Sequence, residues 1–183
     1  MVAITVAERR LAIPENVKVE VEGRKVKVTG QKGSLVKDLS HMPVKISIEN
    51  GTIVVSAVWP RKRETSMVGT ALSKIKSMLT GVTEGYTYKL KVVYAHFPVT
   101  VKVLKADRKV LIENFGGEKV ARSAEIFGDV EVSVAGDDVL VKGIELESVS
   151  QTAANIEATA GIKGKDLRVF LDGIYVYEKS VGM

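Results

Sequence analysis

The first half of the chain alternates apolar and polar residues in short stretches. Residues 17–21 and 26–28 place valine at every second position, with lysine or glutamate between. This period of two is typical of strands that bury one face and expose the other. Residues 45–49 and 52–58 flank Asn50-Gly51, which favours a tight hairpin because both positions tolerate positive φ. The pattern therefore predicts antiparallel strands.

The periodicity then changes to that of a helix. Between residues 67 and 79 the apolar side chains follow helical spacing, with lysines on the other faces. Thr65 or Ser66 is expected to cap the start of this helix, and Gly81 to end it. Residues 86–93 are expected to form the last strand of the first half.

The second half repeats this order of elements. Ile13-Pro14 opens the first half and Phe97-Pro98 opens the second, 84 residues later. At the same offset Val17, Val19, Val26 and Val28 match the apolar residues Val101, Val103, Val110 and Ile112. Residues 130–134 and 139–141 alternate again, on either side of a predicted turn at 136–138.

The end of the second half predicts a helix and a strand pair. The helix is expected over residues 148–160, because Ser148 and Gln151 have capping-box spacing and Gly161 can end it. Residues 168–177 are expected to form two strands around a tight turn at Asp172-Gly173.

These elements predict an α+β fold with two tandem copies of a small antiparallel sheet packed on one helix. The first repeat is expected to span residues 1–93 and the second 94–183, with the linker near residues 93–97. We expect each repeat to fold by itself.

Composition narrows the class of protein. A hydrophobic fraction of 45% and a charged fraction of 27% are ordinary for a folded chain. The chain has no cysteine, which excludes disulfides and thiolate metal sites and fits a cytoplasmic location. Its start lacks the apolar run of a signal peptide, and no stretch is long and apolar enough to predict a membrane helix.

The charge is unevenly placed. The formal net charge is +5, which suggests a polyanionic partner. Residues 1–93 hold 16 Lys and Arg against 8 Asp and Glu, whereas residues 94–183 hold 11 against 14. Bulk charge therefore favours a binding surface on the first half, and a site on the second half requires local clustering.

The residues for catalysis are missing. Only two histidines occur, His41 and His96, and both are expected in loops. The acidic residues of the second half lie at strand ends and alternating positions, as on a solvated face. We therefore predict no enzyme activity and no cofactor. An RNA-modifying enzyme is disfavoured because no cofactor motif or His or Cys cluster is present.

Two groups of cations stand out in the first half. Gly30 to Ser34 is predicted to be a turn, at which Lys32 could contact a phosphate. Arg61, Lys62 and Arg63 form the densest positive run, just ahead of the first helix, where backbone N–H groups also favour anions.

The most specific segment lies near the end of the chain. It combines a polar helix start, a basic loop and a strand with an aromatic residue near a turn. Such residues can neutralise phosphates and donate hydrogen bonds to sugar edges. The candidate RNA-binding residues are Ser148, Ser150, Gln151, Thr152, Asn155, Lys163, Lys165, Arg168 and Tyr175.

Residues 150–157 and 165–175 closely resemble the archaeal and eukaryotic branch of the sixth large-subunit ribosomal protein family. Ile13-Pro14, the turn at residues 30–33 and the duplication also resemble this family, so the likeness covers essentially the whole chain.

The resemblance implies two tandem α+β domains in a structural constituent of the large ribosomal subunit. It implies binding to large-subunit ribosomal RNA near the sarcin–ricin loop, beside neighbouring ribosomal proteins and the site where translation factors dock. It also implies that the second domain makes the main contact, through residues 148–155 and 163–168. A protein-interaction module with duplicated domains remains the alternative, because such domains can also bind proteins.

Overall fold

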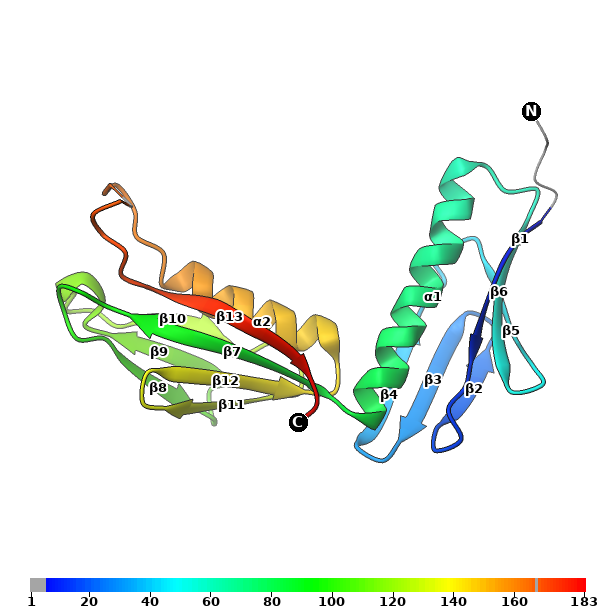
Figure 1. Cartoon of the computed structure of the whole chain (residues 1–183), viewed down its shortest axis with the longest axis horizontal. Coiled ribbons are helices and arrows are strands. Elements are labelled where there is room, and N and C mark those ends of the chain that lie inside the picture. The colour runs from blue at the N-terminus through cyan, green and yellow to red at the C-terminus, as the bar shows by residue number, and fades with distance from the viewer. Residues whose placement is uncertain (1–5, 167) are drawn as a thin grey trace. The chain divides into compact units, whose positions relative to one another are not determined.

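The computed structural model describes residues 6–166 and 168–183 and divides into two compact units, Met1–Glu84 and Gly85–Met183 (Figure 1). Each unit combines antiparallel strands with one long helix, which confirms the predicted α+β class. Each unit also has its own core of buried apolar side chains.

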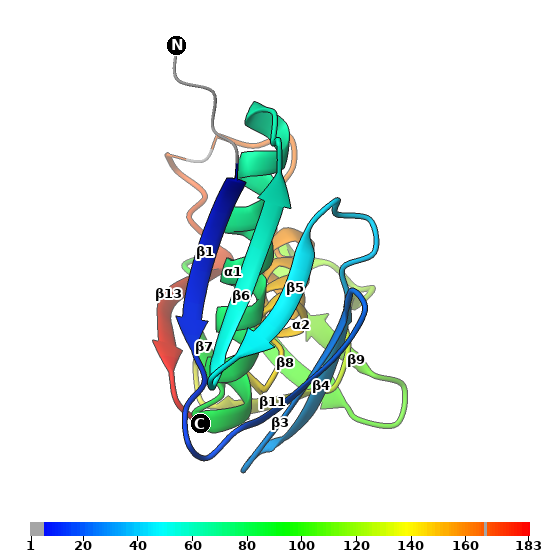
Figure 2. The same ribbon diagram turned by 90° about the vertical axis from the view of Figure 1, so that its right-hand side faces the viewer.

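Unit 1 holds two three-stranded sheets and a long helix. The first sheet has the order β1-β6-β5 and the second β2-β3-β4, and all pairs are antiparallel. The helix α1 lies behind the β1-β6-β5 sheet in Figure 2. The elements are β1 (Val6–Ala12), β2 (Lys18–Glu22), β3 (Lys25–Gly30), β4 (Gly33–Asp38), β5 (Lys45–Glu49), β6 (Thr52–Val58) and α1 (Lys62–Thr83).

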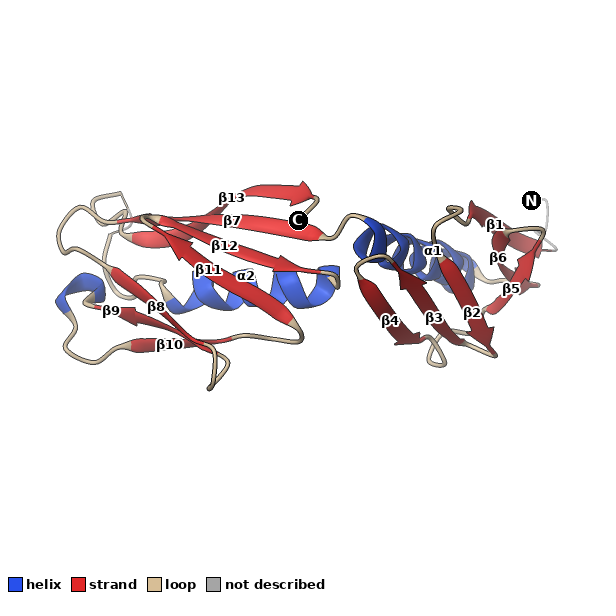
Figure 3. Ribbon diagram, turned by 90° about the horizontal axis from the view of Figure 1, so that it is seen from below, coloured by secondary structure: helices blue, strands red, loops and turns tan. Residues whose placement is uncertain are grey.

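Unit 2 repeats this plan with one additional strand. Its sheets have the orders β11-β12-β7-β13 and β10-β9-β8, and α2 packs against strands of both (Figure 3). The elements are β7 (Tyr86–Val93), β8 (Thr100–Leu104), β9 (Lys109–Glu113), the 3-10 turn η1 (Phe115–Gly117), β10 (Arg122–Glu125), β11 (Val130–Ala135), β12 (Asp138–Gly143), α2 (Leu146–Thr159) and β13 (Gly173–Val181).

The strand at residues 86–93 belongs to the second unit rather than ending the first. Leu90 pairs with Val139 of β12, and Val92 pairs with Ile174 of β13, so β7 is a central strand of the four-stranded sheet. Its counterpart in unit 1 is β1, which pairs with β6 in the same way. Each repeat therefore begins with a strand ahead of its Xaa-Pro pair. The division at 84/85 differs from our expected boundary because alternation reveals a strand but not its partner.

The first helix begins earlier and ends later than expected. The Arg61 N–H donates to Glu64 Oε2 at 2.6 Å, which satisfies one backbone donor at the helix start. Thr65 and Ser66 lie inside the helix, where their hydroxyls donate to the carbonyl oxygens of Arg61 and Lys62. Their predicted role as caps was therefore wrong. The helix also runs past the buried Gly81 to Thr83.

The predictions at the end of the chain also need correction. Helix α2 begins at Leu146, so Ser148 lies inside its first turn and does not cap it. Residues 168–177 do not form a strand pair. Instead β13 is a single strand that starts at Gly173 and pairs with β7. The reason is that the carboxylate of Asp172 binds backbone N–H groups of the β7–β8 connection, so Asp172 anchors a long-range contact.

The turns predicted from neighbouring residues in the first half agree with the structure, unlike the predicted helix caps. Asn50 and Gly51 have φ of 48° and 72° and join β5 to β6, as the Asn-Gly pair predicted. The turn predicted near residues 30–33 joins β3 to β4. Neither helix of the described chain combines the length and apolar character needed to cross a membrane.

Candidate nucleic-acid interface

The middle of α2 carries polar side chains on an accessible face of the helix. The Gln151 side-chain nitrogen donates to Asn155 Oδ1 at 2.8 Å, and Asn155 Nδ2 donates to the backbone oxygen of Glu125 at 3.0 Å. Gln151 is exposed, and Ser150 and Asn155 are half-buried. These three predicted site residues therefore lie on one surface that links α2 to the end of β10.

Two other predicted residues of this helix face inward. Ser148 and Thr152 are both 0% exposed. The Ser148 hydroxyl donates to Glu145 Oε2 at 2.5 Å, while the Thr152 hydroxyl accepts from the Phe127 N–H and donates to the Phe127 carbonyl. Their hydrogen bonds hold unit 2 together, so their side chains are not presented to an external RNA.

The basic loop follows α2 and is exposed. Lys163, Lys165 and Arg168 all have exposed side chains. Lys165 Nζ lies 4.6 Å from the centroid of the Phe170 ring, a cation–π contact. The Phe170 ring stacks on the ring of His96 with centroids 4.8 Å apart. The loop is thus tied through an aromatic pair to the β7–β8 connection.

A buried carboxylate holds the far end of this loop. Asp172 is 5% exposed and accepts hydrogen bonds from the Ala95 N–H at 2.8 Å and the His96 N–H at 3.3 Å. Its second oxygen lies 3.0 Å from His96 Nδ1. Burial raises the pKa of the Asp172 carboxyl, but the hydrogen bonds from Ala95 and His96 outweigh it and lower that pKa to about 2. Asp172 is therefore ionised over the whole physiological range.

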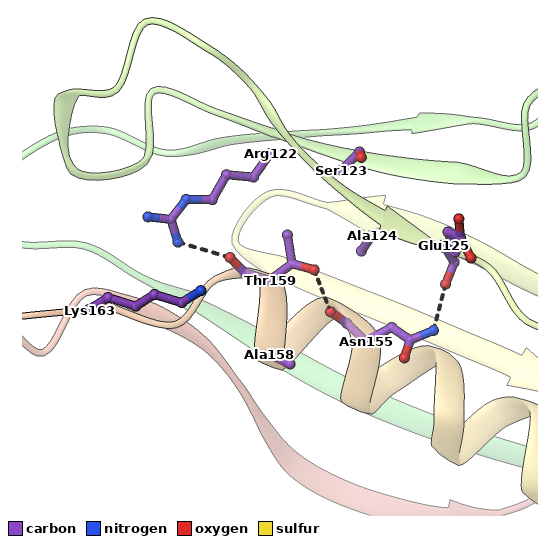
Figure 4. A pocket seen from close by; sticks show the side chains of 8 residues that line it. All are labelled: Arg122, Ser123, Ala124, Glu125, Asn155, Ala158, Thr159 and Lys163. Carbon is purple, nitrogen blue, oxygen red and sulfur yellow. Dashed lines mark hydrogen bonds between the residues drawn. The ribbon is translucent and has the colours of Figure 1, made fainter.

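Arg122 holds the near end of the loop, and no local pattern in the chain predicted this role. From β10 its Nη1 donates to the backbone oxygen of Thr159 at 2.9 Å, at the end of α2 (Figure 4). The same nitrogen donates to the backbone oxygen of Gly161 at 2.8 Å. Its other nitrogens bind both carboxylate oxygens of Glu118. The hydrogen bond from Arg122 lowers the pKa of Glu118, with a smaller contribution from the charge of Lys165.

Two shallow hollows lie side by side along α2 and share one lining residue. The first, of about 640 Å³, is lined by residues of β10 and α2 and by Lys163 (Figure 4). The second, of about 550 Å³, is lined by Phe127, Glu147, Ser150, Gln151 and Asn155. Because Asn155 lines both hollows, the polar side chains of α2 and Lys163 of the basic loop form a continuous surface.

Tyr175 lies on a different face. Its neighbours Ile174 and Val176 are both part of the core of unit 2, so the side chain of Tyr175 points to the opposite side of the sheet. Its hydroxyl donates to the Leu171 carbonyl at 3.3 Å. The structure therefore does not bring Tyr175 onto the surface formed by α2.

The candidates of unit 1 lie at opposite ends of α1. Arg61, Lys62 and Arg63 are exposed at its start. Lys32 lies in the β3–β4 turn, where its N–H donates to the Val82 carbonyl in the last turn of the helix. A helix of 22 residues is about 33 Å long, so these cations form two separate groups.

The structural division keeps the charge asymmetry. Residues 1–84 hold 14 Lys and Arg against 8 Asp and Glu, a net charge of +6, and residues 85–183 hold 13 against 14, a net charge of −1. Several acids of unit 2 are ion-paired with cations outside the basic loop, namely Glu113, Glu118, Asp138 and Glu178. The loop itself holds Lys163, Lys165 and Arg168 against the single acid Asp166, so its local charge is more positive than the net charge of its unit.

The sequence model of the family described as Ribosomal protein L6 matches residues 13–85 and 97–173. The large ribosomal subunit protein uL6 of Staphylothermus marinus is 49% identical over 180 residues, covering 97% of each chain. The chain belongs to the ribosomal protein L6 family. The uL6 proteins of Desulfurococcus amylolyticus and Methanothrix thermoacetophila are 45% and 47% identical, over 95% and 93% of this chain.

Membership in the ribosomal protein L6 family confirms the resemblance seen in the sequence and the interpretation as a structural ribosomal protein rather than an enzyme. The part of the chain that the structure describes contains no group of three or more His, Asp or Glu residues suited to a metal ion.

Proposed function

We propose that this member of the ribosomal protein L6 family is a structural constituent of the large subunit of the cytoplasmic ribosome and binds its RNA mainly through unit 2. The RNA segment we propose is the region near the sarcin–ricin loop, beside the site where translation factors dock. Neighbouring ribosomal proteins are the other partners that this position implies. The observation that carries the proposal is the continuous surface formed by the polar side chains of α2 and Lys163, with the exposed Lys165 and Arg168 following in the same loop.

Each part of the surface has a distinct task. Lys163, Lys165 and Arg168 neutralise phosphates, which supplies most of the affinity for a polyanion. The amides of Gln151 and Asn155 donate to sugar and base edges. The Ser150 hydroxyl donates its hydrogen to the Glu147 carbonyl, so its oxygen accepts from a sugar hydroxyl. Ser148 and Thr152 support this surface from the core. The anchoring of the loop at Arg122 and Asp172 reduces the ordering cost of binding.

Unit 1 offers a second, weaker contact. Arg61, Lys62 and Arg63 lie where the backbone N–H groups of the α1 start also favour anions. Lys32 is a separate phosphate contact at the other end of the helix, and Tyr175 would need RNA on the opposite face of the unit 2 sheet. The net charge of unit 1 adds long-range attraction.

The test replaces Lys163, Lys165 and Arg168 together by alanine and measures affinity for a ribosomal RNA fragment containing the sarcin–ricin region. Three lost phosphate contacts should reduce the slope of log affinity against log salt by roughly two to three units. The matched control replaces Arg61, Lys62 and Arg63. If the control change abolishes binding while the loop variant keeps its affinity and salt slope, the site lies on unit 1 and our assignment fails.

A further inference from the structure

Phe127 has the most exposed phenylalanine ring of the described part of unit 2. Phe127 lies in the connection between β10 and β11 and is 57% exposed, whereas Phe115 of the same unit is 2% exposed. Phenylalanine side chains usually contribute their large apolar area to a core. The ring of Phe127 instead lines the hollow beside Ser150, Gln151 and Asn155.

The backbone of Phe127 is held from two sides. Its N–H donates to Thr152 Oγ1 at 3.0 Å, and its carbonyl accepts from the same hydroxyl at 3.3 Å. The next residue, Gly128, has φ of 67°, and a Cβ there would collide with the side chain of Ser148. The Arg108 guanidinium donates to the Gly128 carbonyl. The exposed ring is therefore displayed on a fixed support.

The amides beside the ring are also oriented. The bond from Gln151 to Asn155 and the bond from Asn155 to the Glu125 carbonyl fix both side chains. Among the described residues, the bond between the amides uses only one of the two N–H groups of Gln151. Its oxygen and second N–H remain for a ligand that carries both donors and acceptors.

We propose that Phe127 is a stacking platform for one unpaired RNA base, whose edge is recognised by Gln151 and Asn155. Every base has a π-face that can stack on a phenyl ring, and base edges carry the donors and acceptors that amides complement. Glu147 in the same hollow is acidic, which disfavours a phosphate there. The phosphates then lie toward Lys163, which lines the adjoining hollow. This inference rests on the proposed function of unit 2.

The test measures binding of the full chain to the same ribosomal RNA fragment and to a fully paired RNA duplex. Phe127→Leu should weaken binding to the fragment by roughly five- to a hundredfold at constant salt. The salt slope should not change, because no phosphate contact is lost. Binding to the duplex should stay the same, and Phe127→Trp should retain affinity for the fragment. The matched control is Tyr177→Leu, which removes an aromatic ring that is 54% exposed on β13.

Different failures have different meanings. If Phe127→Leu leaves fragment affinity unchanged while the variant of Lys163, Lys165 and Arg168 lowers the salt slope, the stacking inference is wrong and the proposed function stands. If neither variant changes binding, both are wrong. If Phe127→Leu impairs only incorporation into the large subunit and not binding to naked RNA, a protein covers the ring and the base-stacking inference is overturned.

Discussion

Arg122 is the residue whose replacement should most sharply loosen the proposed interface. Its guanidinium donates to the carbonyl oxygens of Thr159 and Gly161, binds the carboxylate of Glu118 and lies 4.4 Å from the centroid of the Phe115 ring. It therefore fixes the point at which α2 ends and the basic loop begins. Arg122→Ala removes all of these contacts and leaves the last carbonyls of α2 without that donor.

The expected loss of stability follows from these contacts. A hydrogen bond from a charged donor contributes about 1.5 to 3 kcal/mol, and two of them reach the end of α2. The pair with Glu118 adds little, because the Glu118 side chain is half-exposed and solvent screens the ion pair. The contact with Phe115 contributes about 1 kcal/mol. The sum overestimates the effect, since one guanidinium makes every contact and water can reach the freed carbonyls. We expect a decrease of about 3 kcal/mol in the free energy of unfolding of unit 2.

Hydrogen exchange measured by mass spectrometry can separate the two units of the full chain. Arg122→Ala should speed amide exchange at the end of α2 and in residues 161–166, and leave unit 1 unchanged. Arg122→Lys should give an intermediate loss, because lysine keeps the charge but lacks the planar fork that binds several acceptors at once. The control variant is Arg10→Ala, which removes an exposed ion pair with Glu8 in unit 1. A loss under about 1 kcal/mol for Arg122→Ala, with unchanged exchange in the loop, would refute the role assigned to this residue.

Two further predictions concern the loop anchor and the division of the chain. The lowered pKa of Asp172 means that its stabilising contribution is complete above the ordinary value of 3.8 and is lost as pH falls towards about 2. Asp172→Asn should therefore be less stable than the unchanged chain at neutral pH, and this difference should shrink across that window in urea titrations. A difference that is constant from pH 7 to pH 2 would contradict the anchoring role. Residues 1–84 and 85–183, expressed separately, should each unfold cooperatively by circular dichroism, because each unit has its own core. If both fragments lack a cooperative transition while the whole chain shows one, the units are not independent.

The order of neighbouring residues was sufficient to predict those elements of this protein that depend only on contacts between near neighbours in the chain. Alternating valines predicted β2, β3 and β11 because one face of each strand contacts a core. The Asn50-Gly51 turn was predictable because positive φ is a property of the residues themselves. Strand β1 was missed because three charged residues among its seven obscure the alternation of Ala7 and Leu11.

The tertiary structure decided which residues meet. Alternation alone could not assign β7 to the second sheet, because a strand pattern carries no information about its hydrogen-bonding partner. Helical spacing placed Ser148 and Gln151 on one helix, but only packing against the Phe127 connection buries Ser148 and leaves Gln151 exposed. Asp172 lies 77 positions from Ala95, and Arg122 lies 37 from Thr159, so no local pattern could reveal either anchor of the basic loop. The sequence by itself thus determined most of the strands, both helices, the family and the charged segments. The folded chain determined which of those side chains share a surface, since that depends on contacts between distant residues.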